Sequence, residues 1–235
     1  MWKEGALGGE RMPEHAHPLL SRSSDRLAIY FTLGMALNYQ RDSYALWRAC
    51  TQMFEDTATS WVFDPVSAAA ATRAKLADAL VRHRVALQPN RHPEIWARNA
   101  SGLVQHSDCS VRRLFENHGY ALGGVKTFMS ANKHSFPYLC GPKILNYWLY
   151  VMSEYLDWPF VGRSALSVAP DRHVIAASRK LGLVGSDEAD GSVLSLLVAD
   201  RWRAVLVPTH LLPIDIHTPL WLWSRAGFPD ITSAR

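Results

Sequence analysis

The sequence predicts an all-α fold. Apolar residues recur at the three- to four-residue spacing of amphipathic helices through most of the 235 residues. No stretch alternates with the period of two that marks a half-buried strand. N-cap residues, prolines and glycines divide the pattern into about ten segments of ordinary helix length. Nearly half of the residues are hydrophobic, which is enough to bury a substantial core in a chain of this length.

The N-terminal residues 1–22 contain several glycines and prolines and are expected to form a flexible arm. The segments that follow the arm are each bounded by residues that start or stop helices. The expected helices, in chain order, span residues 24–39, 43–54, 67–84, 93–103, 110–117, 125–133, 142–155, 170–182, 192–207 and 213–225.

Local signals support the individual helices. Ser24 and Asp42 offer N-cap side chains to the first two, and the third is rich in alanine. Pro93 stands at a first helical position, where its missing N–H costs nothing. Asp171 stands where an N-cap is expected, and Gly182 ends that segment. The remaining segments are predicted from apolar spacing alone.

Composition narrows the classes of function. The formal net charge is +4 and the pI is about 9.0, which permits nucleic-acid binding without requiring it. The three cysteines lack metal-site spacing and the histidines form no HExxH motif, so we expect no metal and no cofactor. With no secretory signal and no apolar run long enough to span a bilayer, we expect a monomer located in the cytoplasm or on the nucleoid, without a membrane partner.

The segment Pro-Tyr-Leu-Cys-Gly-Pro-Lys, which ends at Lys143, carries the strongest chemical signal. A Gly-Pro turn opens a helix there, and backbone N–H groups at such a turn are expected to face an anion. Lysine is unusual in a first turn, because its charge opposes the helix dipole. An ordinary connection between two helices is the alternative reading. The residues of the predicted phosphate-binding hairpin are Pro137, Tyr138, Leu139, Cys140 and Gly141.

The hairpin resembles the helix-hairpin-helix (HhH-GPD) DNA glycosylase superfamily, which contains endonuclease III and the 8-oxoguanine DNA glycosylases. The family hairpin reads Leu-Pro-Gly-Val-Gly-x-Lys. Gly141 and Lys143 match it, and Pro137 stands one residue before the position of the family proline. Leu139 replaces the glycine that in the family lets the backbone approach DNA phosphate. The resemblance implies a bifunctional enzyme in which Lys143, as a neutral amine, attacks the sugar C1′ and forms a Schiff base. Burial or the helix N-terminus is expected to keep that amine neutral.

A catalytic aspartate is the second part of this resemblance. Family members carry Val-Asp-x-His-Val at a helix start after the lysine, and the run from Ala169 to Val174 is similar, with Asp171 at the acidic position. Asp171 would stabilise positive charge that develops on the sugar, while a simple N-cap is its alternative role. Asp215, in the run Leu212 to His217, fits the pattern too but lies much further along, and is expected as an additional carboxylate.

Two further groups of residues are candidates for contact with DNA. The segment before Ser43 is similar to the family segment that fills the gap left by an extruded base, although a helix C-cap followed by a polar loop fits as well. Its matching residues are Asn38, Gln40 and Arg41. Aromatic residues can stack on an extruded base, although most tryptophans are core residues. The candidates for a base pocket are Trp148, His173, Trp221 and Trp223.

The resemblance implies two helical subdomains with the active cleft between them. Residues 43–160 would form a six-helix barrel that includes the helix-hairpin-helix at about 125–155, and residues 23–42 with 161–235 would form the other subdomain. The implied function is removal of a modified base, such as an oxidised one, from double-stranded DNA, with strand cleavage. The alternatives are an N-glycosidase for modified nucleosides or nucleotides, similar to the queuosine-salvage hydrolases, and a non-catalytic DNA-binding module.

Overall fold

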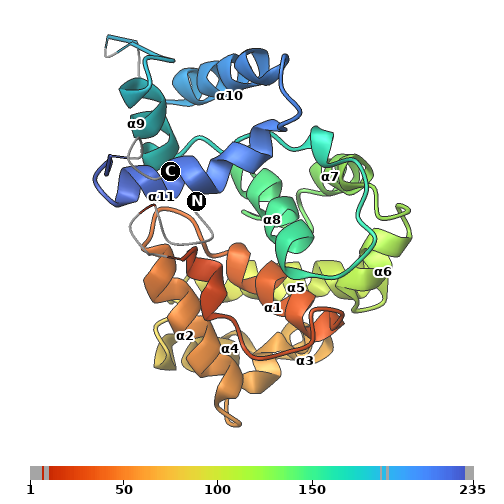
Figure 1. The fold of residues 1–235 in the computed structure, drawn as a ribbon. Coiled ribbons are helices and arrows are strands. Elements are labelled where there is room, and N and C mark those ends of the chain that lie inside the picture. The colour runs from red at the N-terminus through yellow and green to blue at the C-terminus, as the bar shows by residue number, and fades with distance from the viewer. Residues whose placement is uncertain (1–6, 8–10, 186, 189–190, 231–235) are drawn as a thin grey trace. The chain divides into compact units, whose positions relative to one another are not determined.

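The computed structural model describes residue 7 and residues 11–185, 187–188 and 191–230. Helices are the regular structure of this part of the chain, and an isolated bridge between Ala121 and Val161 is the only strand-like pairing in it (Figure 1). The predicted all-α class is therefore confirmed. No helix in the described ranges is both long and apolar enough to cross a membrane.

The chain divides into two compact units, Pro13–Gly162 and Arg163–Arg235, the latter together with Met1–Met12. The first unit contains the 3₁₀ turns η2 (Pro13–Ala16) and η3 (Ser60–Phe63) and the helices α1 (Asp25–Met35), α2 (Ser43–Glu55), α3 (Pro65–Ala70), α4 (Arg73–Arg82), α5 (His92–Ser107), α6 (Val111–Glu116), α7 (Leu122–Ala131) and α8 (Pro142–Tyr155). The second contains η4 (Arg163–Ala165), α9 (Arg172–Lys180), α10 (Ser192–Leu206), η5 (Pro213–Ile216) and α11 (His217–Arg225).

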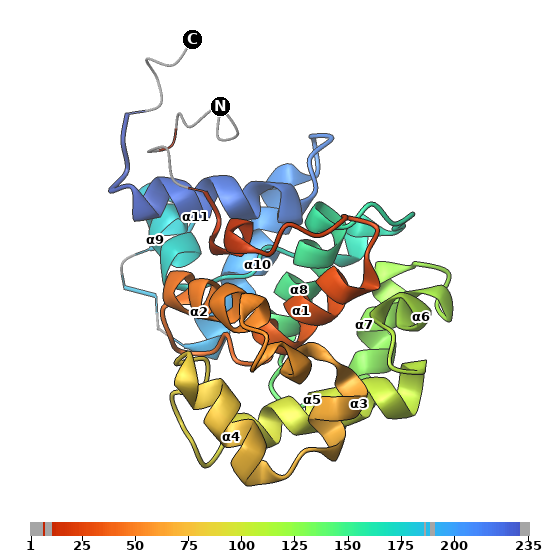
Figure 2. The same cartoon turned by 90° about the horizontal axis from the view of Figure 1, so that it is seen from below.

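Helix α1 forms the centre of the first unit. Every residue from Leu27 to Met35 is buried, and α1 packs on α2, α5, α6 and α8 (Figure 2). Gly34 permits a close approach, because a Cβ there would lie 2.7 Å from the Trp47 ring. A helix that is apolar all round must be covered on all sides. The structure therefore differs from the expected division, in which residues 23–42 belonged to the other subdomain.

Two expected helix boundaries also differ. The expected helix 67–84 is split into α3 and α4, because Ala71 is extended and the Thr72 hydroxyl accepts a hydrogen bond from the Lys75 N–H. This local cap outweighs the helix propensity of the surrounding alanines. The first helix ends at Met35 rather than Tyr39, and Gln40 adopts a positive φ of 50°.

The segment after residue 12 is anchored, so the expectation of a flexible arm over residues 1–22 is wrong for this part. Glu14 in η2 is buried, and its two carboxyl oxygens accept hydrogen bonds from the Trp47 indole N–H (3.0 Å) and the Tyr147 hydroxyl (2.9 Å). These bonds tie η2 to α2 and α8. Residues 1–6 and 8–10 of the expected arm lie outside the described residues.

Glu14 gives the stability of the protein a pH dependence. Burial raises the pKa of Glu14 from 4.5 to about 7, so the folded protein retains a proton that the unfolded chain releases. The stability associated with this carboxyl is complete below pH 4.5 and is lost as the pH rises through 7. We expect Glu14→Gln to remove this loss, on the order of 3 kcal/mol between the two limits. Urea unfolding at pH 5 and pH 8 measures it.

The exposed Glu55 on α2 provides the control for this prediction. Glu55→Gln should leave the pH dependence of unfolding as it is in the wild-type protein. Equal pH dependence in wild type and Glu14→Gln would show that the buried carboxyl is not the titrating group.

In the second unit, α9 packs against α11, and α10 contacts α9 and η5. The Trp202 indole N–H of α10 donates to the Ser178 hydroxyl of α9 (2.9 Å). Arg201 pairs with Glu188 at 2.7 Å and so joins α10 to the loop that precedes it. These contacts fix α9 and α11, the two helices that hold the expected aspartate and the tryptophans of the C-terminal part.

Candidate nucleic-acid interface and candidate catalytic residues

Helices α7 and α8 pack on each other and are joined by residues 132–141, of which residues 136–141 form a turn with internal hydrogen bonds. Tyr138 adopts a positive φ of 65°, and Gly141 is favoured because a Cβ there would lie 3.3 Å from the Tyr138 carbonyl. The N–H groups of Leu139, Cys140 and Gly141 donate to the carbonyls of Pro137, Phe136 and Tyr138. These three N–H groups are used inside the turn, so the expectation that they face a phosphate is wrong.

Leu139 is an anchor of this turn. Its side chain is fully buried, as is that of Phe136, and the Asn99 amide donates to the Pro137 carbonyl at 3.0 Å. The side chain of Leu139 points into the core, so the replacement of the family glycine puts no side chain on the outer face of the turn. A leucine at this position fixes the turn to the body of the first unit.

We expect Leu139→Ala to destabilise the protein by about 3 kcal/mol, because truncation of a fully buried leucine leaves a cavity. Urea unfolding gives the change. The exposed Leu87 is the control, and Leu87→Ala should change stability by well under about 1 kcal/mol. Similar stabilities for the two variants would contradict the buried placement of Leu139.

Lys143 lies in the first turn of α8 with an exposed side chain. The N-cap of this helix is Gly141, so no side chain caps its first N–H groups. The expectation that burial keeps the lysine neutral is therefore wrong. One turn further on, the buried Asn146 accepts a hydrogen bond from the Lys126 ammonium at 3.5 Å. This end of α8 therefore presents cationic groups around a helix N-terminus.

The turn and the segment before α2 meet through aromatic side chains. The rings of Tyr39 and Tyr138 lie edge to face with centroids 5.8 Å apart, and the Arg91 guanidinium lies 5.0 Å above the Tyr138 ring. Tyr39, Gln40 and Arg91 are exposed. We name the group of Tyr39, Gln40, Arg91 and Tyr138 the tyrosine ridge. It combines aromatic faces with a cation, as surfaces that bind single-stranded or opened nucleic acid do.

The three residues expected to fill the gap left by an extruded base differ in exposure and in hydrogen bonding. Gln40 is exposed at a positive φ. Asn38 accepts a hydrogen bond from the Ser43 hydroxyl (2.8 Å), and Arg41 donates to the Val85 carbonyl (2.7 Å). Only Gln40 has the exposure that a side chain inserted into DNA needs. Tyr39 lies inside the expected segment and its aromatic ring was a signal, whereas Arg91 had no signal in the sequence.

Asp171 is the N-cap of α9 and lies beside α11. Its Oδ1 accepts from the N–H groups of His173 (2.9 Å) and Val174 (3.0 Å), and its Oδ2 accepts from the Trp221 indole N–H (2.9 Å). The His173 and Trp221 rings meet edge to face at 5.1 Å. Partial burial lowers the pKa of His173 from its ordinary value. The structure thus brings Asp171, His173 and Trp221 together, and the Arg225 guanidinium lies over the indole.

Asp215 is occupied by structural bonds. It pairs with Arg163 at 3.0 Å, and its other oxygen accepts a hydrogen bond from the Leu212 N–H (2.9 Å). These bonds join η4 and η5 within the second unit. Asp215 therefore has a sufficient structural reason to be a carboxylate.

Two of the expected base-pocket tryptophans have other surroundings. Trp148 is fully buried in the first unit, packs on Phe115 and donates its indole N–H to Thr32. It is a core residue, so the expectation of a base pocket is wrong for it. Trp223 is half-buried and donates to the Pro229 carbonyl at the end of α11.

The cysteine thiols and the metal-ligating side chains have the following surroundings. Burial raises the pKa values of Cys50 and Cys140 to about 12, so their thiols are poor nucleophiles. Among the described residues, no group of three His, Cys, Asp or Glu side chains has the arrangement of a metal site. No family model matches the chain, and neither does any curated protein or solved structure.

Proposed function

We propose that this protein is a DNA glycosylase with an associated lyase activity that removes a modified base from double-stranded DNA. The observation that carries the proposal is the position of Lys143, an exposed lysine in the first turn of α8, directly after the tight turn from α7. A lysine at this position is what the resemblance to the glycosylase family implies for the nucleophile.

The chemistry follows from an amine at this position. Lys143 Nζ bonds to the sugar C1′ while the C1′–N bond breaks, and the base leaves with that electron pair and takes up an amine proton. The C1′–O4′ bond then opens to give a protonated Schiff base, and O4′ takes up a proton from water. Water removes a C2′ proton as the C3′–O bond breaks, so the phosphate leaves with that electron pair and the strand is cleaved. A further water molecule hydrolyses the Schiff base and releases the lysine. The positive field of the helix N-terminus favours the neutral amine that begins the reaction.

The tyrosine ridge supports nucleic acid as the substrate. Extrusion of a base leaves neighbouring bases unstacked, and exposed aromatic side chains can replace the lost stacking. Tyr39 and Tyr138 offer such faces, Gln40 offers a hydrogen-bonding side chain, and Arg91 offers a cation for the backbone.

We assign Asp171 the role of the carboxylate that stabilises positive charge on the sugar. The observation that supports it is the grouping with His173 and Trp221, which gives a carboxylate, an imidazole and an aromatic ring in one place. Its cap bonds hold the carboxylate in a fixed orientation, which is a requirement for electrostatic stabilisation of a transition state.

One observation favours the alternative N-glycosidase for free modified nucleosides or nucleotides. The N–H groups of the turn from α7 to α8 are bonded internally, so the turn does not offer them to a DNA phosphate. An enzyme for a free nucleoside needs no such clamp.

Borohydride trapping distinguishes the two. Duplexes that each carry one modified base are incubated with the protein and borohydride, and modified nucleosides are tested in parallel for release of the base. A covalent adduct on a duplex supports the proposed function. Release of base from nucleosides, with no adduct on any duplex, would support the alternative.

A further inference from the structure

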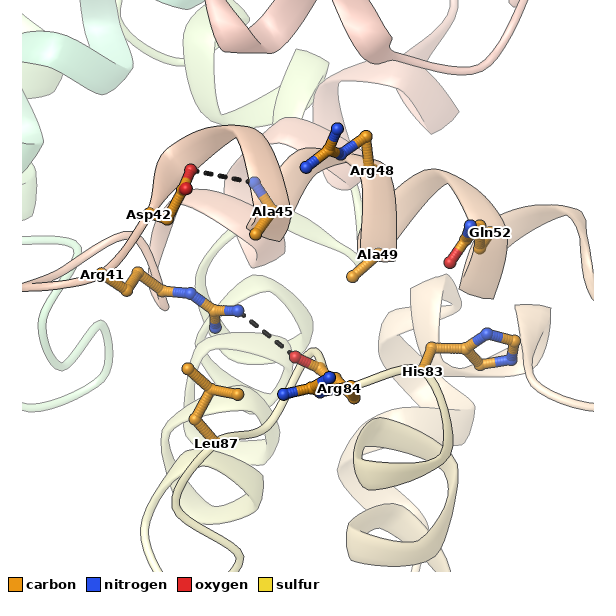
Figure 3. A pocket seen from close by; sticks show the side chains of 9 residues that line it. All are labelled: Arg41, Asp42, Ala45, Arg48, Ala49, Gln52, His83, Arg84 and Leu87. Atoms are coloured by element: carbon orange, nitrogen blue, oxygen red, sulfur yellow. Dashed lines mark hydrogen bonds between the residues drawn. The ribbon is translucent and has the colours of Figure 1, made fainter.

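A depression lies between α2 and the turn that follows α4 in the first unit (Figure 3). Its volume is about 360 Å³, which is within the range of small-ligand sites. We name it the arginine pocket. The residues that line it are Arg41, Asp42, Ala45, Arg48, Ala49, Gln52, His83, Arg84 and Leu87.

Positive charge dominates this pocket. Arg48 and Arg84 are exposed, and in the described part of the chain no hydrogen bond or ion pair engages either guanidinium. Arg41 donates to the carbonyls of Val85 (2.7 Å) and Arg84 (3.3 Å), and no carboxylate among the described residues is bonded to it. Burial lowers the pKa of Arg41, so its charge is poorly solvated and an anion nearby would stabilise it.

One carboxylate faces the three arginines of the pocket and offsets their positive charge only in part. Asp42 is its only carboxylate, and its Oδ1 accepts from the Ala45 N–H at 3.1 Å as the cap of α2. His83 is bonded to Asp56 at 2.9 Å. Guanidinium groups in excess over carboxylates are the usual arrangement for a phosphate.

One wall of the pocket is apolar. Ala45 and Ala49 line it from α2, and the half-exposed Leu87 lines it from the turn after α4. A free inorganic anion gains nothing from contact with an apolar wall, whereas the sugar attached to a phosphate can pack against it.

Two short links join the pocket to the tyrosine ridge. Arg41 directly follows Gln40 in the chain, and the N–H of Leu87 donates to Nδ1 of His92, the residue after Arg91. We propose that the arginine pocket holds a backbone phosphate and its sugar in a nucleic-acid strand whose neighbouring bases contact the tyrosine ridge. The proposal rests on the proposed function for its substrate class. It gives the protein a phosphate contact in place of the turn from α7 to α8.

The test is a double substitution, Arg48→Gln with Arg84→Gln, in the full chain. The matched control is Lys75→Gln with Arg113→Gln, which removes the same charge from exposed positions at the far end of α4 and on α6. Anisotropy of a fluorescent 20-mer duplex is titrated over a range of salt concentrations. Thermal unfolding confirms that each variant folds, and a deoxynucleoside monophosphate is titrated as a competitor.

We expect the magnitude of the slope of log affinity against log salt to fall by about one for the pocket variant, because the pocket holds one phosphate. The control should have the wild-type slope. Equal slopes for the pocket variant and the control would overturn the proposal. So would tight binding of the monophosphate at the pocket with no binding of duplex. The wild-type protein could give no borohydride-trapped adduct while the pocket variant still has the lower salt slope. That result would refute the proposed chemistry and leave the phosphate site in place.

Discussion

Lys143→Ala is expected to abolish both the borohydride-trapped adduct and strand cleavage. The substitution removes the amine that in the proposed reaction bonds to C1′. The other amine near this end of α8, that of Lys126, donates a hydrogen bond to Asn146. Loss of a covalent nucleophile leaves only binding and electrostatic effects, so we expect the rate to fall by at least about 10³-fold. The exposed side chain is not part of the core, so the variant should fold as the wild type does.

The measurement is trapping and nicking of a lesion duplex at enzyme excess. Lys133→Ala is the control, because Lys133 is also exposed and lies in the connection between α7 and α8. It tests whether any nearby cation is sufficient, and it should keep the adduct. An undiminished adduct in Lys143→Ala would exclude this lysine as the nucleophile, and loss in both variants would indicate a defect of binding.

Most of the secondary structure could be predicted because its signals are local. Asp42, Ser110 and Asp171 cap the helices that follow them through bonds to N–H groups two or three residues away. Such caps depend on short stretches of sequence. The helix propensity of alanine predicts one helix over residues 67–84, which is wrong. Thr72 caps a separate helix there, and this local cap outweighs the propensity.

The surroundings of the candidate residues could not be predicted, because they depend on contacts between distant parts of the chain. Glu14 receives its hydrogen bonds from Trp47 and Tyr147. No pattern near residue 14 indicates that a carboxyl there is buried. Trp148 and Leu139 belong to the core for similar reasons, since a helix face is assigned to core or site only once its neighbours are known.

The candidate site also combines local features that the sequence predicts with contacts between distant segments that it does not. The aromatic and polar character of residues 38–41 was visible in the sequence, but the contact of Tyr39 with Tyr138 and Arg91 needs three distant segments to meet. Likewise, the cap role of Asp171 was predictable, whereas its bond to Trp221 was not. That second bond is what allows its structural and chemical roles to be tested separately.

Asp171→Asn is expected to lower turnover about 100-fold or more while costing roughly 1–2 kcal/mol of stability. Removal of a charge that stabilises a transition state costs on the order of 2–4 kcal/mol of barrier. The stability cost arises because both carboxyl oxygens accept hydrogen bonds, Oδ1 from the α9 backbone and Oδ2 from Trp221. Asparagine keeps one acceptor and places an NH₂ group against a donor.

Asp215→Asn is the matched control, since the same chemical change is made in the same unit to a carboxylate whose two oxygens are also engaged, by Arg163 and the Leu212 N–H. Single-turnover release of the base and thermal unfolding are measured for both variants. We expect similar losses of stability but a large loss of rate for Asp171→Asn alone. Equal effects on both rate and stability would reduce Asp171 to a helix cap. A rate loss confined to Asp215→Asn would instead make Asp215 the carboxylate of the reaction. Both variants are expected to lose similar stability, so a difference in rate between them reports the chemical role.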